Sequence, residues 1–128
     1  MTTWSSDELD KIAKADELQL ASLRNDGTLR KPVTVWVVRH GNELYVRSAY
    51  TRNAGWFRGI QVRHEGHIRA GDVAKHVSFV NADPALNDEI DAAYRSKYHP
   101  HGAKYVDMVV TTEARFTTIR LVPLARNP

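Results

Sequence analysis

Most hydrophobic positions of this chain fall in short runs of strand period, and two segments follow a helical period instead. In the first of these two, Ser5 and Glu8 have the spacing of a capping box, and Trp4 and Leu9 have the spacing of a hydrophobic staple. These signals predict that a helix occupies residues 6–15.

A β-hairpin is predicted next along the chain. Residues 18–24 alternate loosely between apolar and polar side chains, and the sequence Asn-Asp-Gly at 25–27 is a strong turn signal. The returning segment, 31–39, is dense in β-branched and aromatic residues and is apolar on both faces over 33–38. This pattern predicts a central strand that is covered on both sides.

The segment 43–48 predicts a strand with two different faces. Leu44 and Val46 point to one side, which we expect to be core, and Tyr45 and Arg47 point to the other, which we expect to be amphipathic. Further on, the sequence predicts a short helix at 56–61. It also predicts three more strands, at 66–72, 73–80 and 115–122.

The second helical segment begins at Asp83 and Pro84, a typical N-cap followed by proline at the first helical position. It should be the longest helix and should end before Pro100. Its apolar stripe consists of Leu86, Ile90, Ala93, Tyr94 and Tyr98. With some six strands and two longer helices, the chain predicts an α+β fold built on a mainly antiparallel barrel.

Length and composition narrow the class of protein. At 128 residues, with no internal repeat or linker-like stretch, the chain is expected to form one domain over 1–128. It has no cysteine, which excludes disulfides and zinc fingers and suits a reducing compartment, so we expect a soluble, cytoplasmic protein. Neither a secretion signal nor an apolar run of about 20 residues is present, so we expect no membrane association.

Charge and motifs exclude several function classes. The net charge is +3, but 18 basic residues are interspersed with 15 acidic ones, which makes nucleic acid an unlikely partner. Two histidine pairs lack the spacing of a metal site, so no metal is expected, and no nucleophile elbow or glycine-rich phosphate loop occurs. The histidine pairs are His64 with His67 and His99 with His101.

One segment combines groups that could bind a phosphate and a planar ring. It supplies guanidiniums, hydroxyls and an indole from Arg47, Ser48, Tyr50, Thr51, Arg52, Asn53, Trp56 and Arg58. Arginine grips phosphate through paired hydrogen bonds, and an indole can stack on a ring. The alternative interpretation is that Trp56 and Ile60 pack a short helix onto the barrel while the arginines are solvated. For the aromatic and cationic residues at 94–99, capping and packing are preferred over a ligand.

This segment carries a family resemblance. Tyr-Val-Arg-Ser at 45–48, the loop to Gly55 and Trp-Phe-Arg at 56–58 resemble the FMN-binding split-barrel superfamily, especially its deazaflavin-dependent nitroreductase-like members. The glycine, basic residue and proline within 27–33 are also similar. The whole chain further resembles a bacterial family of unknown function near that superfamily, through 26–27, 36–38, 45–48 and 90–98.

The resemblance implies a six-stranded split barrel with two longer flanking helices, usually a homodimer, with FMN or a deazaflavin at the dimer interface. By position, Arg47, Ser48 and the loop through Trp56 would meet the cofactor phosphate, and Lys31, Pro32, Val33 and Thr34 would line its ring. The cofactor-binding residues predicted are therefore Lys31, Pro32, Val33, Thr34, Arg47, Ser48, Tyr50, Arg52, Trp56 and Arg58.

Two departures from the superfamily pattern keep a second function open. Ala49 and Tyr50 replace paired glycines, and 56–60 reads Trp-Phe-Arg-Gly-Ile where the superfamily has Trp-Tyr-x-Asn-Leu. The leading hypothesis is a flavin- or deazaflavin-binding oxidoreductase. The alternative is a non-catalytic binding or interaction protein that has lost the cofactor. An open groove beside Trp56 would favour binding, and a groove filled by Tyr50 would favour loss. A homodimer is also expected because one small barrel would not cover both faces of 33–38.

Overall fold

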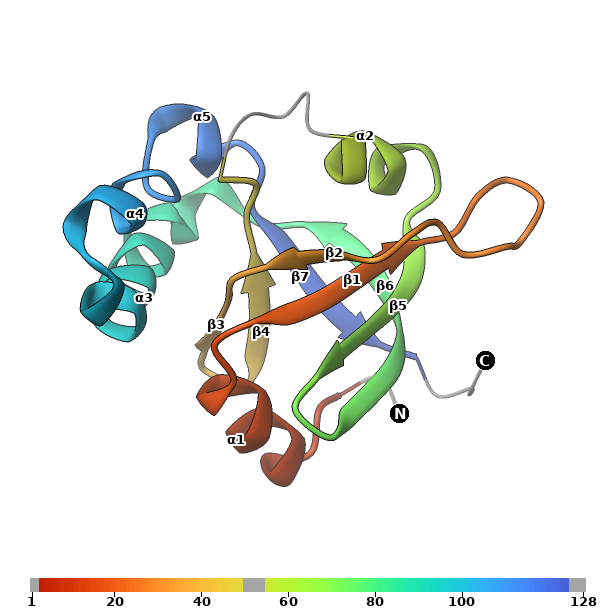
Figure 1. Ribbon diagram of the computed structural model, residues 1–128, viewed down its shortest axis with the longest axis horizontal. Helices are drawn as coiled ribbons and strands as arrows, with labels where there is room; N and C mark the ends of the chain where they lie inside the picture. The colour runs from red at the N-terminus through yellow and green to blue at the C-terminus, as the bar shows by residue number, and fades with distance from the viewer. Residues whose placement is uncertain (1–2, 50–54, 125–128) are drawn as a thin grey trace.

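The structure is a computed structural model that describes residues 3–49 and 55–124. Its centre is a sheet of seven strands in the order β2-β1-β5-β6-β7-β4-β3, and every neighbouring pair is antiparallel. The sheet curls into a nearly closed barrel (Figure 1). The strands are β1 (Leu18–Ser22), β2 (Val33–Val35), β3 (Val37–His40), β4 (Glu43–Val46), β5 (Glu65–Ala70), β6 (Val73–Asn81) and β7 (Ile119–Pro123).

The barrel closes through a break in one extended segment. Strands β2 and β3 lie at opposite ends of the sheet order, yet only Trp36 separates them in the sequence. The first part of the segment pairs with β1 and the second part pairs with β4. The strand expected at 31–39 is therefore two short strands, which explains why the sheet has seven strands where six were expected. The predicted α+β, antiparallel barrel class is confirmed.

Helices cover the two ends of the barrel and one side of it (Figure 1). Helix α1 lies at the lower end in this view, α2 lies at the upper end, and α3, α4 and α5 lie together on the left. None of the helices in the described part of the chain has the length and apolar character that a membrane span requires. The helices are α1 (Ser6–Lys14), α2 (Gly55–Val62), α3 (Asn87–Tyr98), α4 (Ala103–Asp107) and α5 (Thr112–Arg115), with 3-10 turns η1 (Pro84–Leu86) and η2 (His99–His101).

Local signals placed several of these elements correctly. Ser5 and Glu8 form the predicted capping box at the start of α1. Gly27 has a φ of 89° in the turn that joins β1 to β2, and Asp83 accepts a hydrogen bond from the backbone of η1. The last predicted strand was wrong at its start, because helix α5 ends at Arg115, residues 116–117 form a turn and β7 begins only at Ile119.

Two hydrophobic clusters lie on opposite sides of β3 and β4. Val37, Leu44 and Val46 belong to the cluster inside the barrel, and Val38 and Tyr45 belong to a second cluster beneath α3. The expectation that the second face of 43–48 is amphipathic was therefore wrong, because α3 covers it. The chain itself also covers β3 on both faces, so this strand gives no physical reason for a homodimer, which stays a prediction.

Candidate functional site

Tyr98 of helix α3 stabilises the break between strands β2 and β3 at Trp36. The indole of Trp36 stacks on the ring of Tyr98, with centroids 4.1 Å apart and planes 5° from parallel. The Tyr98 hydroxyl donates to the carbonyl oxygen of Asp16 at 2.7 Å and accepts from the backbone N–H of Val37 at 3.1 Å. Burial raises the pKa of Tyr98, so the hydroxyl stays protonated. One side chain thus satisfies a backbone N–H at the strand break and a backbone carbonyl just before β1.

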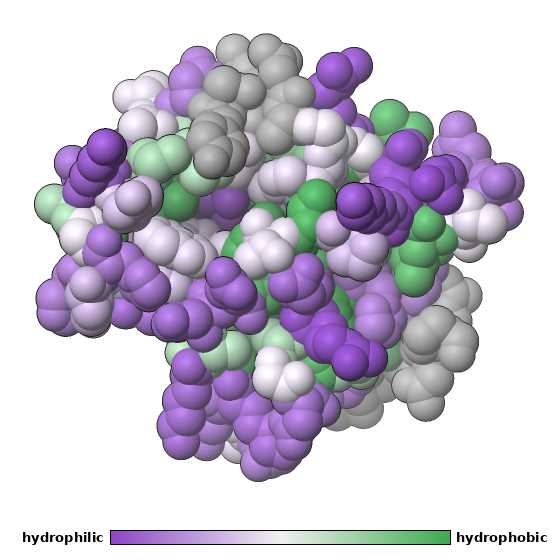
Figure 2. Space-filling view, in the orientation of Figure 1, coloured by the Kyte–Doolittle hydropathy of each residue, from purple (hydrophilic) through white to green (hydrophobic). Residues whose placement is uncertain are grey.

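A cleft with a volume of about 270 Å³ opens beside this break. In Figure 2 the surface is recessed between helices α4 and α2, and hydrophobic surface gathers next to this recess, over β1 and β2. The cleft collects side chains from the start of β1, from β2, from the end of β4 and from helices α2 and α4. Its lining residues are Glu17, Thr34, Val35, Trp36, Arg47, Ala49, Trp56, Tyr105, Met108 and Val109.

Aromatic side chains dominate the chemistry of the cleft. Trp36 and Trp56 are half-buried, and Tyr105 is 54% exposed although it is a large aromatic residue. Apolar pockets with a few polar groups are the usual binding sites for small organic ligands, and a volume near 300 Å³ is at the small end of that class. The cleft can therefore hold one planar ring system, and longer parts of a ligand would extend outside it.

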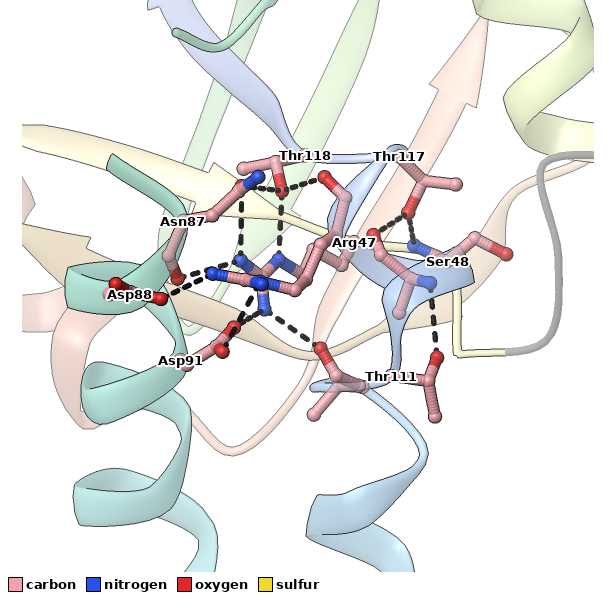
Figure 3. Close-up of polar contacts among 11 residues, drawn as sticks. Arg47, Ser48, Asn87, Asp88, Asp91, Thr111, Thr117 and Thr118 are labelled. Atoms are coloured by element: carbon pink, nitrogen blue, oxygen red, sulfur yellow. Dashed lines mark hydrogen bonds and ion pairs between the residues drawn. The ribbon is translucent and has the colours of Figure 1, made fainter. Parts of the chain in front are cut away.

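Arg47 lies against this cleft but is occupied by the protein itself (Figure 3). Its Nε donates to Thr118 Oγ1 at 2.8 Å. One terminal nitrogen donates to Asp91 Oδ1 at 2.5 Å and to the Val109 carbonyl at 2.9 Å, and the other donates to the Asn87 carbonyl at 3.2 Å. Its side chain is fully buried. A cofactor phosphate could reach this guanidinium only by displacing these partners.

The same network fastens α3 and α5 to the barrel. Asp91 is shared, because Arg115 Nε lies 3.4 Å from its second carboxylate oxygen. Arg115 also pairs with Asp88 in the first turn of α3. The Arg47 guanidinium lies 5.6 Å from the centre of the Tyr94 ring, and the Tyr94 hydroxyl donates to the carbonyl of Trp36 at 3.2 Å. Helix α3 therefore joins the buried charges to the wall of the cleft.

The structure brings three of the predicted site residues together at the cleft, namely Thr34, Arg47 and Trp56. Lys31 and Pro32 are exposed ahead of β2, Val33 is half-buried in it, and Arg58 is exposed on α2. Ser48 is buried, and its backbone N–H donates to Thr117 Oγ1 at 2.8 Å. Tyr50, Thr51, Arg52 and Asn53 lie outside the described residues.

Packing explains part of the sequence around Trp56. Ile60 is fully buried and Trp56 packs against the barrel cluster, so helix α2 does pack as the simpler interpretation expected, while Trp56 also lines the cleft. A Cβ atom at Gly59 would lie 2.9 Å from Ser22 Oγ, so this helix sits too close to β1 for a larger residue. The packing interpretation of 94–99 is likewise supported, because Tyr94 and Tyr98 are fully buried.

Sequence reasoning missed most of the cleft, because seven of its ten described lining residues were not among the predicted site residues. Trp36 was assigned to a covered strand, and Glu17 and Tyr105 carried no motif. No local signal marked the break at Trp36, because an aromatic residue among β-branched ones is typical of a continuous strand. The described residues contain no group of three or more histidines and carboxylates that could hold a metal ion.

Three solved structures illustrate what the fold is similar to. An F420-H2 dependent reductase matches with a TM-score of 0.60 and 11% identity, over 84% of this chain and 93% of that chain. A FAD-binding protein from Mesorhizobium loti matches with a TM-score of 0.52 and 13% identity, over 98% and 92%. A protein described as a domain-swapped dimer matches with a TM-score of 0.61 and 11% identity, over 84% and 79%. At these identities the likeness concerns the fold alone.

Sequence comparison gives a narrower result. None of the curated proteins compared with the chain matches it. Residues 8–121, by contrast, match the family described as "Uncharacterized protein conserved in bacteria (DUF2255)". This match spans most of the chain and confirms the suspected resemblance to a bacterial family of unknown function. The chain therefore belongs to the DUF2255 family.

Proposed function

We propose that the protein binds the ring of a flavin or deazaflavin in the cleft beside Trp36 and Trp56 and acts as a small oxidoreductase. The observation that carries this proposal is the aromatic-lined cleft itself, which Trp36 and Trp56 line together. Tyr50, whose bulk was expected to decide between binding and loss of the cofactor, lies outside the described residues. The fold is also similar to that of an F420-H2 dependent reductase and of a FAD-binding protein, which supports the same class of ligand.

The residues present suit the ring better than the phosphate. Trp36, Trp56 and Val35 offer planar and apolar surface to a ring, and Thr34 offers a hydroxyl at the same strand. When bound, a flavin-type group supplies the redox chemistry, and the protein's part is to hold it and to limit its contact with water. We assign the holding of the ring to these four residues.

The phosphate must be bound differently from the way that sequence alone suggested. Because the donors of Arg47 are engaged by Asp91, Asn87, Thr118 and Val109, we do not assign a phosphate contact to it. Among the described cations predicted for the cofactor, Lys31 and Arg58 have side chains in solvent. Substitution of each by alanine tests whether it contributes.

The engagement of Arg47 also favours a second candidate function. A protein that retained the barrel and the cleft but no longer grips a phosphate would bind a small aromatic ligand without redox chemistry. This alternative predicts a colourless protein whose tryptophan fluorescence responds to aromatic ligands but not specifically to FMN or a deazaflavin.

The proposed homodimer is a separate proposal. Its support is the solved structure of similar fold that is described as a domain-swapped dimer. Measurement of the mass in solution at micromolar concentration tests it, and a monomeric mass would contradict it.

The experiment for the proposed function is an absorbance spectrum of the freshly purified protein from about 300 to 500 nm, followed by titration with FMN and with a deazaflavin. We expect saturable binding that Trp56→Ala weakens about tenfold, as expected when stacking on one ring is lost. Val62→Ala is the matched control, because Val62 is 63% exposed on the same helix and does not line the cleft. Absence of binding for both cofactors would refute the proposal.

A further inference from the structure

We propose that Glu17 gives the cleft a charge preference, so that it selects planar aromatic ligands with a positive charge, of the pyridinium class, over anionic rings of the same size. The inference rests on the cleft being the ligand site of the proposed function. It does not depend on whether that ligand is a flavin, and it goes further because it states which chemical class of ring the site accepts.

The charges that line the cleft are unequal in their pairing. Among the described lining residues only Glu17 and Arg47 carry a charge. Arg47 is neutralised by Asp91 at 2.5 Å and is fully buried. The Glu17 side chain, by contrast, is exposed, and no hydrogen bond or ion pair satisfies it within the described part of the chain. The described lining of the cleft therefore presents one uncompensated negative charge to a ligand.

One neighbouring carboxylate, that of Asp16, has the same sign as Glu17. Asp16 directly precedes Glu17, and its carboxylate lies 3.4 Å from Nε2 of His101, a histidine that carries a charge only when protonated. Lys97 donates to the Val37 carbonyl at 2.7 Å, and burial lowers its pKa to about 8, partly offset by Asp16. Its amine is thus directed at the backbone and not at Glu17.

The aromatic residues add a second attraction of the same sign. Trp36, Trp56 and Tyr105 line the cleft together with Glu17. The face of an aromatic ring is negative, and an indole attracts a cation more strongly than other rings do. A flat cation can therefore stack on an indole and meet a carboxylate in one site, whereas an anion is repelled by both.

Trp36, the aromatic residue that would contact this ligand, has a fixed orientation. Trp36 is fixed by stacking on Tyr98 and by the hydrogen bond from Tyr94 to its carbonyl. A site whose aromatic wall is preorganised loses little conformational freedom on binding. The preference should therefore appear as a difference in affinity and not require a rearrangement of the barrel.

The test uses three probes of similar size and different charge: 1-methylnicotinamide, which is a cation, nicotinamide, which is neutral, and nicotinate, which is an anion. Dissociation constants are measured by tryptophan fluorescence and by calorimetry. We expect the affinity to fall in that order and the ratio between cation and anion to shrink when salt is raised. In Glu17→Gln the same ratio should fall about fivefold, the upper range for an exposed charge pair.

Asp72→Asn is the matched control, because it removes one exposed carboxylate that does not line the cleft and changes the net charge equally. Equal affinities, tightest binding of nicotinate, no measurable binding of any probe at millimolar concentration, or an unchanged ratio in Glu17→Gln would each overturn the inference. If the charge order holds while FMN and the deazaflavin fail to bind, the inference stands and the proposed cofactor is wrong.

Discussion

Polar and charged side chains are fully hydrogen-bonded in one region of the molecule and exposed in a neighbouring one. Beneath α3, every donor of Arg47 meets an acceptor, and the guanidinium is fully buried. In the adjacent cleft, Glu17 is exposed and has no hydrogen-bond or ion-pair partner within the described residues, and Tyr105 is 54% exposed. Satisfied and buried polar groups stabilise a fold, whereas unsatisfied groups that converge on a hollow are available for a ligand.

This comparison changes the role assigned to Arg47, which the sequence predicted to bind the cofactor phosphate. Arg47 directly follows strand β4, where the resemblance predicts phosphate binding. Its buried, fully hydrogen-bonded environment is instead that of a residue that stabilises the fold. Buried charges that are fully hydrogen-bonded give little to a ligand, because removing a partner costs several kcal/mol. We therefore place the candidate ligand site in the cleft that Trp36 and Trp56 line.

The largest effect should come from breaking the buried pair. Asp91→Leu leaves the Arg47 guanidinium buried without its carboxylate, and we expect a loss of about 3–5 kcal/mol in the free energy of unfolding, measured by urea denaturation. The double variant Arg47→Met with Asp91→Leu should lose less than the two single variants summed, because no unpaired charge remains.

The control for this prediction is an exposed ion pair at the surface of the protein. Asp10→Asn breaks the pair with Arg39, whose atoms lie 3.0 Å apart with 33% and 62% of the side chains exposed, and should cost less than about 1 kcal/mol. Equal losses for Asp91→Leu and Asp10→Asn would mean that the Arg47 network does not anchor α3.

The contrast also explains which features the sequence could predict. The capping box at Ser5, the turn at Gly27 and the helix after Asp83 depend on residues within a few positions of one another, and all three are present. The partners of Arg47 are distant along the chain, since Asp91 lies 44 positions away and Val109 lies 62 positions away. Nothing in the local sequence distinguishes an arginine that will be buried from one that will be solvated.

The break at Trp36 was missed for the same reason. A run of β-branched and aromatic residues predicts one strand, and the bend arises only when the sheet closes and the two halves pair with β1 and β4. The short helices α4 and α5 carry few periodic positions, so Tyr105 and Met108 were not placed near the cleft.

A smaller effect is expected where the two regions meet, at Tyr98. Tyr98→Phe keeps the stacking on Trp36 but removes the acceptor for the buried Val37 N–H and the donor to Asp16. We expect a loss of about 1–2 kcal/mol in the free energy of unfolding. Tyr105→Phe is the matched control because that ring is 54% exposed, and its loss should be negligible. A negligible loss for Tyr98→Phe would show that the strand break does not need the hydroxyl.

Lys97 gives a pH-dependent effect of smaller size. Burial lowers its folded-state pKa to about 8, so between about pH 8 and the usual value of 10.5 the unfolded chain binds more protons than the folded chain. Stability should therefore rise with pH in this window for the native protein relative to Lys97→Met, by less than about 1 kcal/mol because the amine is only partly buried. Urea denaturation at pH 7.5 and 10 measures it, and parallel curves for the two proteins would contradict the assigned shift.

The smallest effect is expected in the cleft, and it is the one that decides what the cleft is. Glu17 is exposed and makes no contact within the described residues that its charge would stabilise, so Glu17→Gln should change the free energy of unfolding by less than about 0.5 kcal/mol. Thermal and urea denaturation of this variant, compared with the native protein, measure the change. A loss above about 1 kcal/mol would mean that Glu17 supports the fold, and the distinction between a satisfied network and an available cleft would then fail. If Glu17→Gln leaves the free energy of unfolding unchanged but alters the charge preference for ligands, the carboxylate serves binding. A side chain whose removal does not destabilise the protein does not stabilise the fold.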